Sequence, residues 1–244
     1  MTGSVLWKAN SASSDWSDRA VLLRVVERVV ALGMIGDVSW IRPDPDVARQ
    51  PFALAAGPDL PGRLSSAIGG GPVQFEAGGS APGPWELFWN TGEFDASNDS
   101  LRGINTLWLL FDRSQIAERA RADALLAAFL ELNRPDDTDY AVIHSYDHWA
   151  DFADVHYERP ITIASLFRGV FGANFLGPHQ LAEFDRSRLA GLTAPMIRWL
   201  DARGLAFTAT TDLTTADGPA TEAEMLRLTA FFRGALRDDS ICRR

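Results

Sequence analysis

Histidine and carboxylate side chains gather in one stretch of the sequence, HSYDHWADFADVHYE at positions 144–158. Three of the four histidines of the chain lie in it, with three aspartates and one glutamate. His144 and His148 are four residues apart, a spacing that places two imidazoles on one helix face, where they can share a metal ion. Asp147 and Asp151 could add oxygen ligands to such a site.

The cluster at 144–156 therefore indicates one possible function, a metal-dependent hydrolase. Two features oppose it. The run YAVIH at 140–144 is typical of a strand, so that the histidine pair spans a strand–helix junction and the helical spacing argument fails. A zinc hydrolase helix also has a glutamate directly after its first histidine, where this chain has Ser145. We expect no metal and no cofactor, and instead a solvated acidic helix over 147–155.

The negative charge of the chain is concentrated around the same stretch. Residues 131–158 hold eight acids and one arginine, a net charge of −7, whereas the whole chain carries −9. Phosphates require a basic surface, so we expect no nucleic-acid partner. An acidic surface steers basic proteins toward it. We expect the electrostatic binding residues to be Asp136, Asp137, Asp139, Asp147, Asp151, Asp154 and Glu158.

The sequence lacks signals of export and membrane insertion. Its start, MTGSVLWKANSASSDW, has no basic segment followed by an apolar run. No apolar run approaches the roughly 18–20 residues that cross a bilayer. A single cysteine, Cys242, excludes an internal disulfide. We expect a cytoplasmic protein with no membrane partner; the sequence leaves its oligomeric state open.

Motifs of common enzymes are also missing. The glycine-rich SAIGGGP at 66–72 lacks the Lys-Ser/Thr pair of a phosphate-binding loop and the dinucleotide fingerprint. No Gly-x-Ser-x-Gly elbow occurs, so a hydrolase triad has no anchor. We therefore expect a protein that is not an enzyme.

Apolar periodicity predicts the elements of the N-terminal half. A helix from Trp16 to Leu32, capped by Ser14 or Asp15, carries an apolar stripe. The run INTLWLLF at 104–111 is typical of a strand buried on both faces. Further strands are predicted at 5–7, 38–41 and 85–90, with Trp85, Trp89 and Trp108 in the core.

Between these strands, residues 43–85 hold eight of the thirteen prolines and eight of the twenty glycines. Such a composition excludes a continuous helix or central strand. We expect loops with a short helix at 60–68 and a short strand at 72–77. The segment is either a surface excursion or a junction between two subdomains.

The C-terminal half alternates helices and strands. A helix is predicted from Ser114 to Leu132, with Ile116, Ala120, Leu125 and Phe129 among its inward residues. Strands at 140–144, 170–176 and 205–211 and helices at 178–184 and from the capping box Thr221–Glu224 follow. This order predicts a single α+β domain over 1–244, with a mixed or mainly antiparallel sheet, helices packed on it, and two strand–helix–strand units that could be related halves.

The segment FRGVFGANFLGPHQLAEFDRSRL at 167–189 resembles a motif of bacterial toxin immunity proteins, the immunity protein 52 family and the related type VI secretion immunity family. The chain has Ala173 where the family often has tryptophan. The matching residues are Asn174, Phe175, Gly177, Pro178, Leu181, Arg188 and Leu189.

This resemblance implies an inhibitor that binds and neutralises a cognate toxin protein, commonly a nuclease. It implies a structural role for Asn174, Phe175, Gly177 and Pro178, because glycine and proline set a strand-to-helix turn. On this interpretation these four residues shape the fold, and the acidic segment is part of the toxin interface.

Overall fold

The computed structural model of the chain describes residues 3–11, 14–16, 19–43, 47–55, 59–68, 74–91, 104–156, 167 and 169–237. Ten strands form one sheet, and every neighbouring pair is antiparallel. The α+β prediction is confirmed, with an antiparallel sheet. The sheet runs in the order β3-β2-β4-β5-β6-β1-β7-β8-β10-β9.

The first six strands in chain order are β1 (Ser4–Ser11), β2 (Asp37–Arg42), β3 (Gln50–Ala55), β4 (Gln74–Gly79), β5 (Trp85–Thr91) and β6 (Asn105–Asp112). The last four are β7 (Tyr140–Ser145), β8 (Ala173–Leu176), β9 (Met196–Leu200) and β10 (Gly204–Thr208). The seven α-helices within the described residues are α1 (Ala20–Ala31), α2 (Leu60–Ile68), α3 (Arg119–Leu132), α4 (Tyr146–His156), α5 (Pro178–Ala182), α6 (Arg186–Leu189) and α7 (Pro219–Ala235). None of these helices is long and apolar enough to cross a bilayer.

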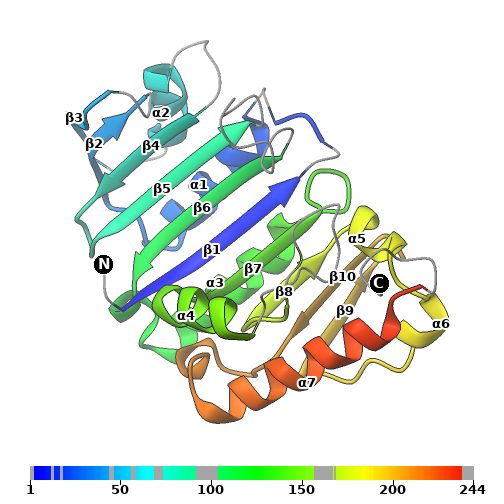
Figure 1. The fold of residues 1–244 in the computed structure, drawn as a ribbon. Coiled ribbons are helices and arrows are strands. Elements are labelled where there is room, and N and C mark those ends of the chain that lie inside the picture. Colours follow the sequence, from blue (N-terminus) through cyan, green and yellow to red (C-terminus); the bar gives the residue numbers. More distant parts are fainter. Residues whose placement is uncertain are drawn as a thin grey trace.

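The helices cover opposite faces of the two halves of the sheet. One core joins α1, α2 and α3 to one face, and a second core joins α4 to α7 to the other face of β7, β8 and β10. The change of face is visible within β7, where Ile143 enters the first core and the adjacent Val142 enters the second. Figure 1 looks onto the second face: α4 and α7 lie in front of it, and α1 and α3 lie behind the sheet. In front of β2, β4, β5, β6 and β1, the described part of the chain places only α4, beside β1.

The structure differs from the sequence predictions at four elements, and the first of them is α1. α1 begins at Ala20, with neither Ser14 nor Asp15 as its cap, because the preceding Trp16 is held by tertiary contacts. Trp16 stacks on Trp89 at 5.0 Å between ring centroids and donates its indole N–H to a backbone oxygen at 2.8 Å. These contacts outweigh the local capping signal.

β3 was not predicted, because Pro51 lies inside it. β3 is the edge strand of the sheet, where a missing N–H is tolerated. β6 is not buried on both faces: its residues alternate between buried and half-buried, and Trp108 is half-buried. In α3, Ala120 is exposed and does not belong to the inward stripe.

Candidate functional site

The structure pairs the acids of segment 131–158 with distant parts of the chain. Asp136 contacts Arg203 of the β9–β10 turn at 2.6 Å. Asp137 contacts Arg24 of α1. Each arginine offsets a charge that the sequence pattern counted as free, so the segment is less negative in the fold than in the sequence.

Other acids of the segment serve the backbone or lie in the interior. Asp139 is 1% exposed, and Ser11 Oγ donates to its carboxylate at 3.2 Å. Asp147 accepts the backbone N–H of Gly3 at 2.7 Å, which ties α4 to the start of β1. Asp151 is exposed on α4 and remains a candidate contact for a partner.

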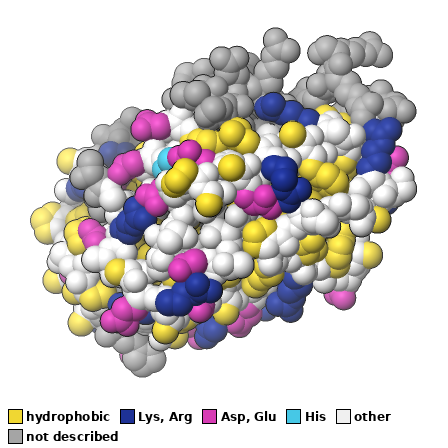
Figure 2. All heavy atoms as spheres, turned by 90° about the horizontal axis from the view of Figure 1, so that it is seen from below, with side chains coloured by type: hydrophobic (Ala, Val, Ile, Leu, Met, Phe, Trp, Pro, Cys, Tyr) yellow, Lys and Arg dark blue, Asp and Glu magenta, His cyan; other side chains and the backbone are white. Residues whose placement is uncertain are grey.

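The side chain of Asp154 and residue Glu158 lie outside the described part of the chain. Seen from below Figure 1, Lys and Arg side chains lie beside Asp and Glu side chains at several places on the surface (Figure 2). This view shows an interspersed charge pattern, not one acidic field.

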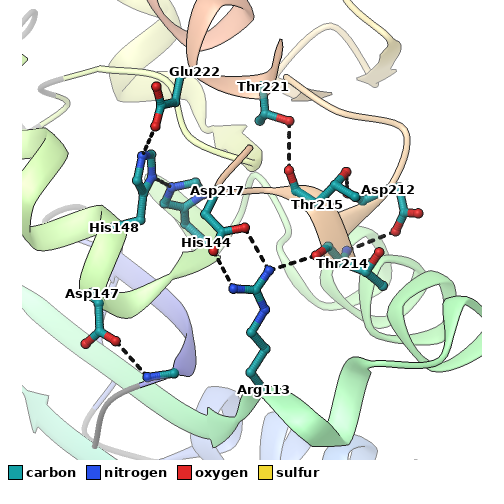
Figure 3. A network of polar contacts seen from close by, with 11 residues as sticks. Arg113, His144, Asp147, His148, Asp212, Thr214, Thr215, Asp217, Thr221 and Glu222 are labelled. Atoms are coloured by element: carbon teal, nitrogen blue, oxygen red, sulfur yellow. Dashed lines mark hydrogen bonds and ion pairs between the residues drawn. The ribbon is translucent and has the colours of Figure 1, made fainter. Parts of the chain in front are cut away.

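His144 and His148 lie on different elements, as predicted, yet their rings touch. Nε2 of His144 in β7 lies 2.6 Å from Nδ1 of His148 in α4. Nε2 of His148 lies 2.7 Å from a carboxylate oxygen of Glu222 in α7. α4 begins directly after β7, and this tight junction brings the rings together, contrary to the expectation that it would spoil their spacing (Figure 3).

The hydrogen bonds of this histidine network have a direction. The backbone N–H of Gly172 donates to Nδ1 of His144 at 3.3 Å, so the proton of that ring is on Nε2. His144 then donates to His148, and His148 donates to Glu222. Burial and the nearby His148 lower the pKa of His144 to about 3, which keeps its ring neutral.

This arrangement gives every ring nitrogen of His144 and His148 a protein partner. A shared metal would need lone pairs that the network already uses, so the geometry does not favour the hydrolase interpretation. Within the described ranges, no group of three or more His, Cys, Asp and Glu side chains could hold a metal ion. The network instead joins β7, α4 and α7.

An ion pair lies beside the histidines (Figure 3). Both terminal nitrogens of Arg113 contact the carboxylate of Asp217, one of them at 2.7 Å, and Arg113 also donates to the Thr214 carbonyl at 2.9 Å. The hydrogen bonds from Arg113 lower the pKa of Asp217. This two-point pairing fixes the turn before α7 against the end of β6.

The motif at 174–178 forms local structure. The Asn174 side chain bonds both backbone groups of Phe171, at 2.8 and 2.7 Å. A Cβ added to Gly177 would lie 2.2 Å from the Thr138 carbonyl oxygen, so only glycine allows this approach. Pro178 occupies the first turn of α5. Phe175 is buried in the first core.

A groove on the second face of the sheet gathers side chains that the sequence did not single out as a site. It has a volume of about 430 Å³. Strand registers place its residues in rows across β4, β5, β6 and β1. The central row is Glu76, Phe88, Trp108 and Lys8, and the row beside it is Gln74, Asn90, Thr106 and Asn10.

Aromatic side chains form much of the groove. Trp40 of β2 lies across Gly78 so closely that an added Cβ would be 2.5 Å from its ring. Trp108 and Phe88 have ring centroids 6.2 Å apart. Tyr146 adds a ring from α4. Large rings flanked by polar groups are typical of binding surfaces.

The sequence contained a weak signal for this groove. In WELFWN at 85–90, Glu86, Phe88 and Asn90 alternate with two tryptophans and a leucine. Trp85 and Trp89 are in the core as predicted, whereas Trp108 lines the groove. Alternation shows that two faces differ, but it does not show which strands stand side by side to form a site.

No known protein family and no curated protein matches the sequence. Among solved structures, the chain resembles the T6SS (type VI secretion system) protein PA0821 of Pseudomonas aeruginosa. The TM-score is 0.56, the sequence identity is 14%, and the match covers 98% of this chain and 79% of that chain. At this identity, the similarity shows a shared fold.

Proposed function

We propose that this chain is an immunity protein that binds and neutralises a cognate toxin of a type VI secretion system in the cytoplasm. The observation that carries the proposal is the fold shared with a type VI secretion protein over 98% of the chain. The motif at 174–178, which resembles that of toxin immunity proteins, supports it independently of the fold.

The contacts of the polar and aromatic side chains support inhibition by binding. The histidine network and the Arg113–Asp217 pair are held by internal contacts that join elements of the fold. The groove instead presents aromatic rings, the side chains that contribute most to protein–protein affinity. A protein that acts by binding needs such a surface and needs no catalytic group.

A growth assay tests this function. The assay requires a candidate toxin gene, to be sought beside the gene of this chain. Its expression should arrest growth of a host that has neither gene, and co-expression of this chain should restore growth. The chain should also copurify with a toxin that has been inactivated at its catalytic residue, which separates binding from enzymatic reversal. Growth arrest that persists although the chain is stably expressed would contradict the proposal.

A further inference from the structure

Three buried polar atoms in the groove have no hydrogen-bond partner within the described part of the chain. They are Oδ1 of Asn10, Oε1 of Gln74 and Nε1 of Trp108. Asn10 is 1% exposed, so solvent reaches it poorly. Unpaired buried polar atoms are unfavourable, and a ligand that supplies donors and an acceptor at these positions would remove the penalty.

The positions of these atoms constrain the ligand. Gln74 is on β4, Trp108 on β6 and Asn10 on β1, three strand spacings from first to last. With about 4.8 Å between strands, this separation is roughly 14 Å, the length of about four extended residues. A single side chain cannot reach all three atoms, whereas an extended segment that crosses the strands can.

The charged side chains are distributed unequally along this path. The carboxylates of Glu76 and Glu86 lie on the β4–β5 side of the groove. Lys8 lies on the β1 side, with its ammonium 5.1 Å from the ring centroid of Trp108 and 5.3 Å from that of Trp149. The β4–β5 side therefore carries the carboxylate acceptors of the groove, and the β1 side carries its ammonium donor.

Arginines of the chain already contact both carboxylates. Arg42 contacts Glu76 at 2.5 Å, and Arg49 contacts Glu86 at 3.3 Å. Each of these contacts involves one nitrogen and one carboxylate oxygen, and a carboxylate accepts several hydrogen bonds. Arg49 also lies 3.9 Å from the ring centroid of Trp40, so the groove already stacks a guanidinium on an aromatic ring.

We propose that the groove binds an extended segment of the cognate toxin through an arginine, which is seated on the β4–β5 side. This inference rests on the proposed immunity function and names the chemistry of its interface. The guanidinium stacks on Phe88 and donates to Gln74 Oε1 and to the carboxylate of Glu76, which lies opposite Phe88 and two residues from Gln74. Arginine combines a flat face with a permanent positive charge, five N–H donors and no acceptor.

The backbone of the same segment satisfies the other two atoms. A backbone carbonyl of the segment accepts a hydrogen bond from Trp108 Nε1. A backbone N–H of the segment donates a hydrogen bond to Asn10 Oδ1. All three unpaired atoms of the groove thereby gain partners of the opposite kind. The toxin arginine takes the electrostatic role that the sequence assigned to segment 136–158.

A titration with a minimal probe tests the groove itself. N-acetyl-arginine methylamide carries the guanidinium, two amide carbonyls and two backbone N–H groups. The indole N–H resonance of Trp108, assigned by its loss in Trp108→Phe, should shift with a Kd on the order of 1–10 mM. The indole resonance of Trp199, which is 41% exposed on β9, should not shift.

Two related probes decide whether arginine is required. The citrulline analogue keeps the shape and loses the charge, and the norleucine analogue keeps only the apolar chain. Each should bind roughly tenfold or more weakly than the arginine probe. If either binds as tightly as the arginine probe, or if no probe shifts Trp108 at about 50 mM, the proposal is overturned.

Variants locate the binding site. Glu76→Gln should weaken arginine-probe binding about fivefold to tenfold, since a charged acceptor is lost. Glu27→Gln, on the exposed face of α1 behind the sheet, is its matched control and should bind as the wild type does. Equal affinity of Glu76→Gln and Glu27→Gln would overturn the placement. Thermal melting of each variant verifies that it is folded.

Binding of the toxin by the variants distinguishes a failure of the arginine assignment from a failure of the proposed immunity function. If the wild-type chain binds its toxin, and Trp108→Phe and Glu76→Gln bind it as tightly as Trp199→Phe and Glu27→Gln do, the arginine assignment fails while the immunity function stands. If no toxin binds any form of the chain, the immunity function fails, and the probe titration still decides whether the groove takes arginine.

Discussion

His144 keeps its hydrogen bonds only as a neutral ring. Its Nδ1 faces the backbone N–H of Gly172, and its Nε2 proton is shared with His148. A proton on Nδ1 would meet a donor instead of an acceptor in a site that is 1% exposed. Arg113 nearby disfavours the charged ring further, although Asp217 opposes this effect.

These contacts predict a dependence of stability on pH. The pKa of His144 is about 3 in the folded chain, below the ordinary value of 6.5. Between these values the unfolded chain binds a proton that the folded chain does not, so the free energy of unfolding falls as pH decreases from 6.5. The slope should approach roughly 1.4 kcal/mol per pH unit for this one group. Urea denaturation between about pH 6.5 and 5 measures it, above the range in which ordinary carboxylates titrate.

Two variants assign this slope to its residue. His144→Asn should flatten the slope and lower stability at neutral pH, because it removes the bond to His148. His179→Asn alters an exposed residue of α5 outside the network and should leave the slope unchanged. A slope that survives in His144→Asn would show that another group titrates.

At the scale of elements, close backbone approaches fix how strands and helices meet. Gly177 ends β8 where the segment before β7 crosses it, and its N–H donates to the Asp139 carbonyl at 2.7 Å. Gly177→Ala would place its Cβ 2.2 Å from a backbone oxygen, which no rotamer change relieves. We expect a loss of about 2–4 kcal/mol in the free energy of unfolding, measured in urea.

The matched control is Gly62→Ala in α2. A Cβ at Gly62 meets nothing within 4 Å, and alanine favours a helix. This variant should be stabilised by about 0.5–1 kcal/mol. Equal stability changes in the two variants would contradict the view that Gly177 is required by a close approach.

Apolar periodicity predicted most elements, because it reports the face that each segment buries. It predicted the inner stripe of α1, and the expected short helix at 60–68 is α2 at the bounds observed. The prediction failed where contacts between distant residues decide the structure. α1 begins after Trp16 because Trp16 stacks on Trp89, and Pro51 is tolerated in β3 because β3 is the edge strand. The pairing of Asp137 with Arg24 joins residues 113 positions apart, and no local pattern encodes it.

At the scale of the whole molecule, helices cover opposite faces of the two halves of the sheet. This arrangement leaves the second face of β2, β4, β5, β6 and β1 with the groove. The groove could not be predicted from the sequence, because its rows join residues from four strands whose order requires the full topology. The acidic segment, by contrast, was evident in the sequence and is partly neutralised in the fold.

Two charge reversals compare these surfaces. Glu86→Lys places a cation in the groove and should weaken toxin binding roughly tenfold or more. Asp136→Lys alters an exposed acid of the segment, beside Arg203, and should change the Kd less than about threefold. Biolayer interferometry at two salt concentrations measures both. A stronger effect at Asp136 would return the interface to the acidic segment.

The most direct test of the immunity function is a calorimetric titration of this chain with the candidate toxin that this chain rescues in the growth assay. An immunity protein should bind its toxin with a Kd on the order of nanomolar, because it must occupy nearly every toxin molecule in the cell. Saturable binding of this strength by a catalytically inactive toxin is the predicted result. No detectable binding at about 10 μM of both proteins, with each shown to be folded, would contradict the immunity function.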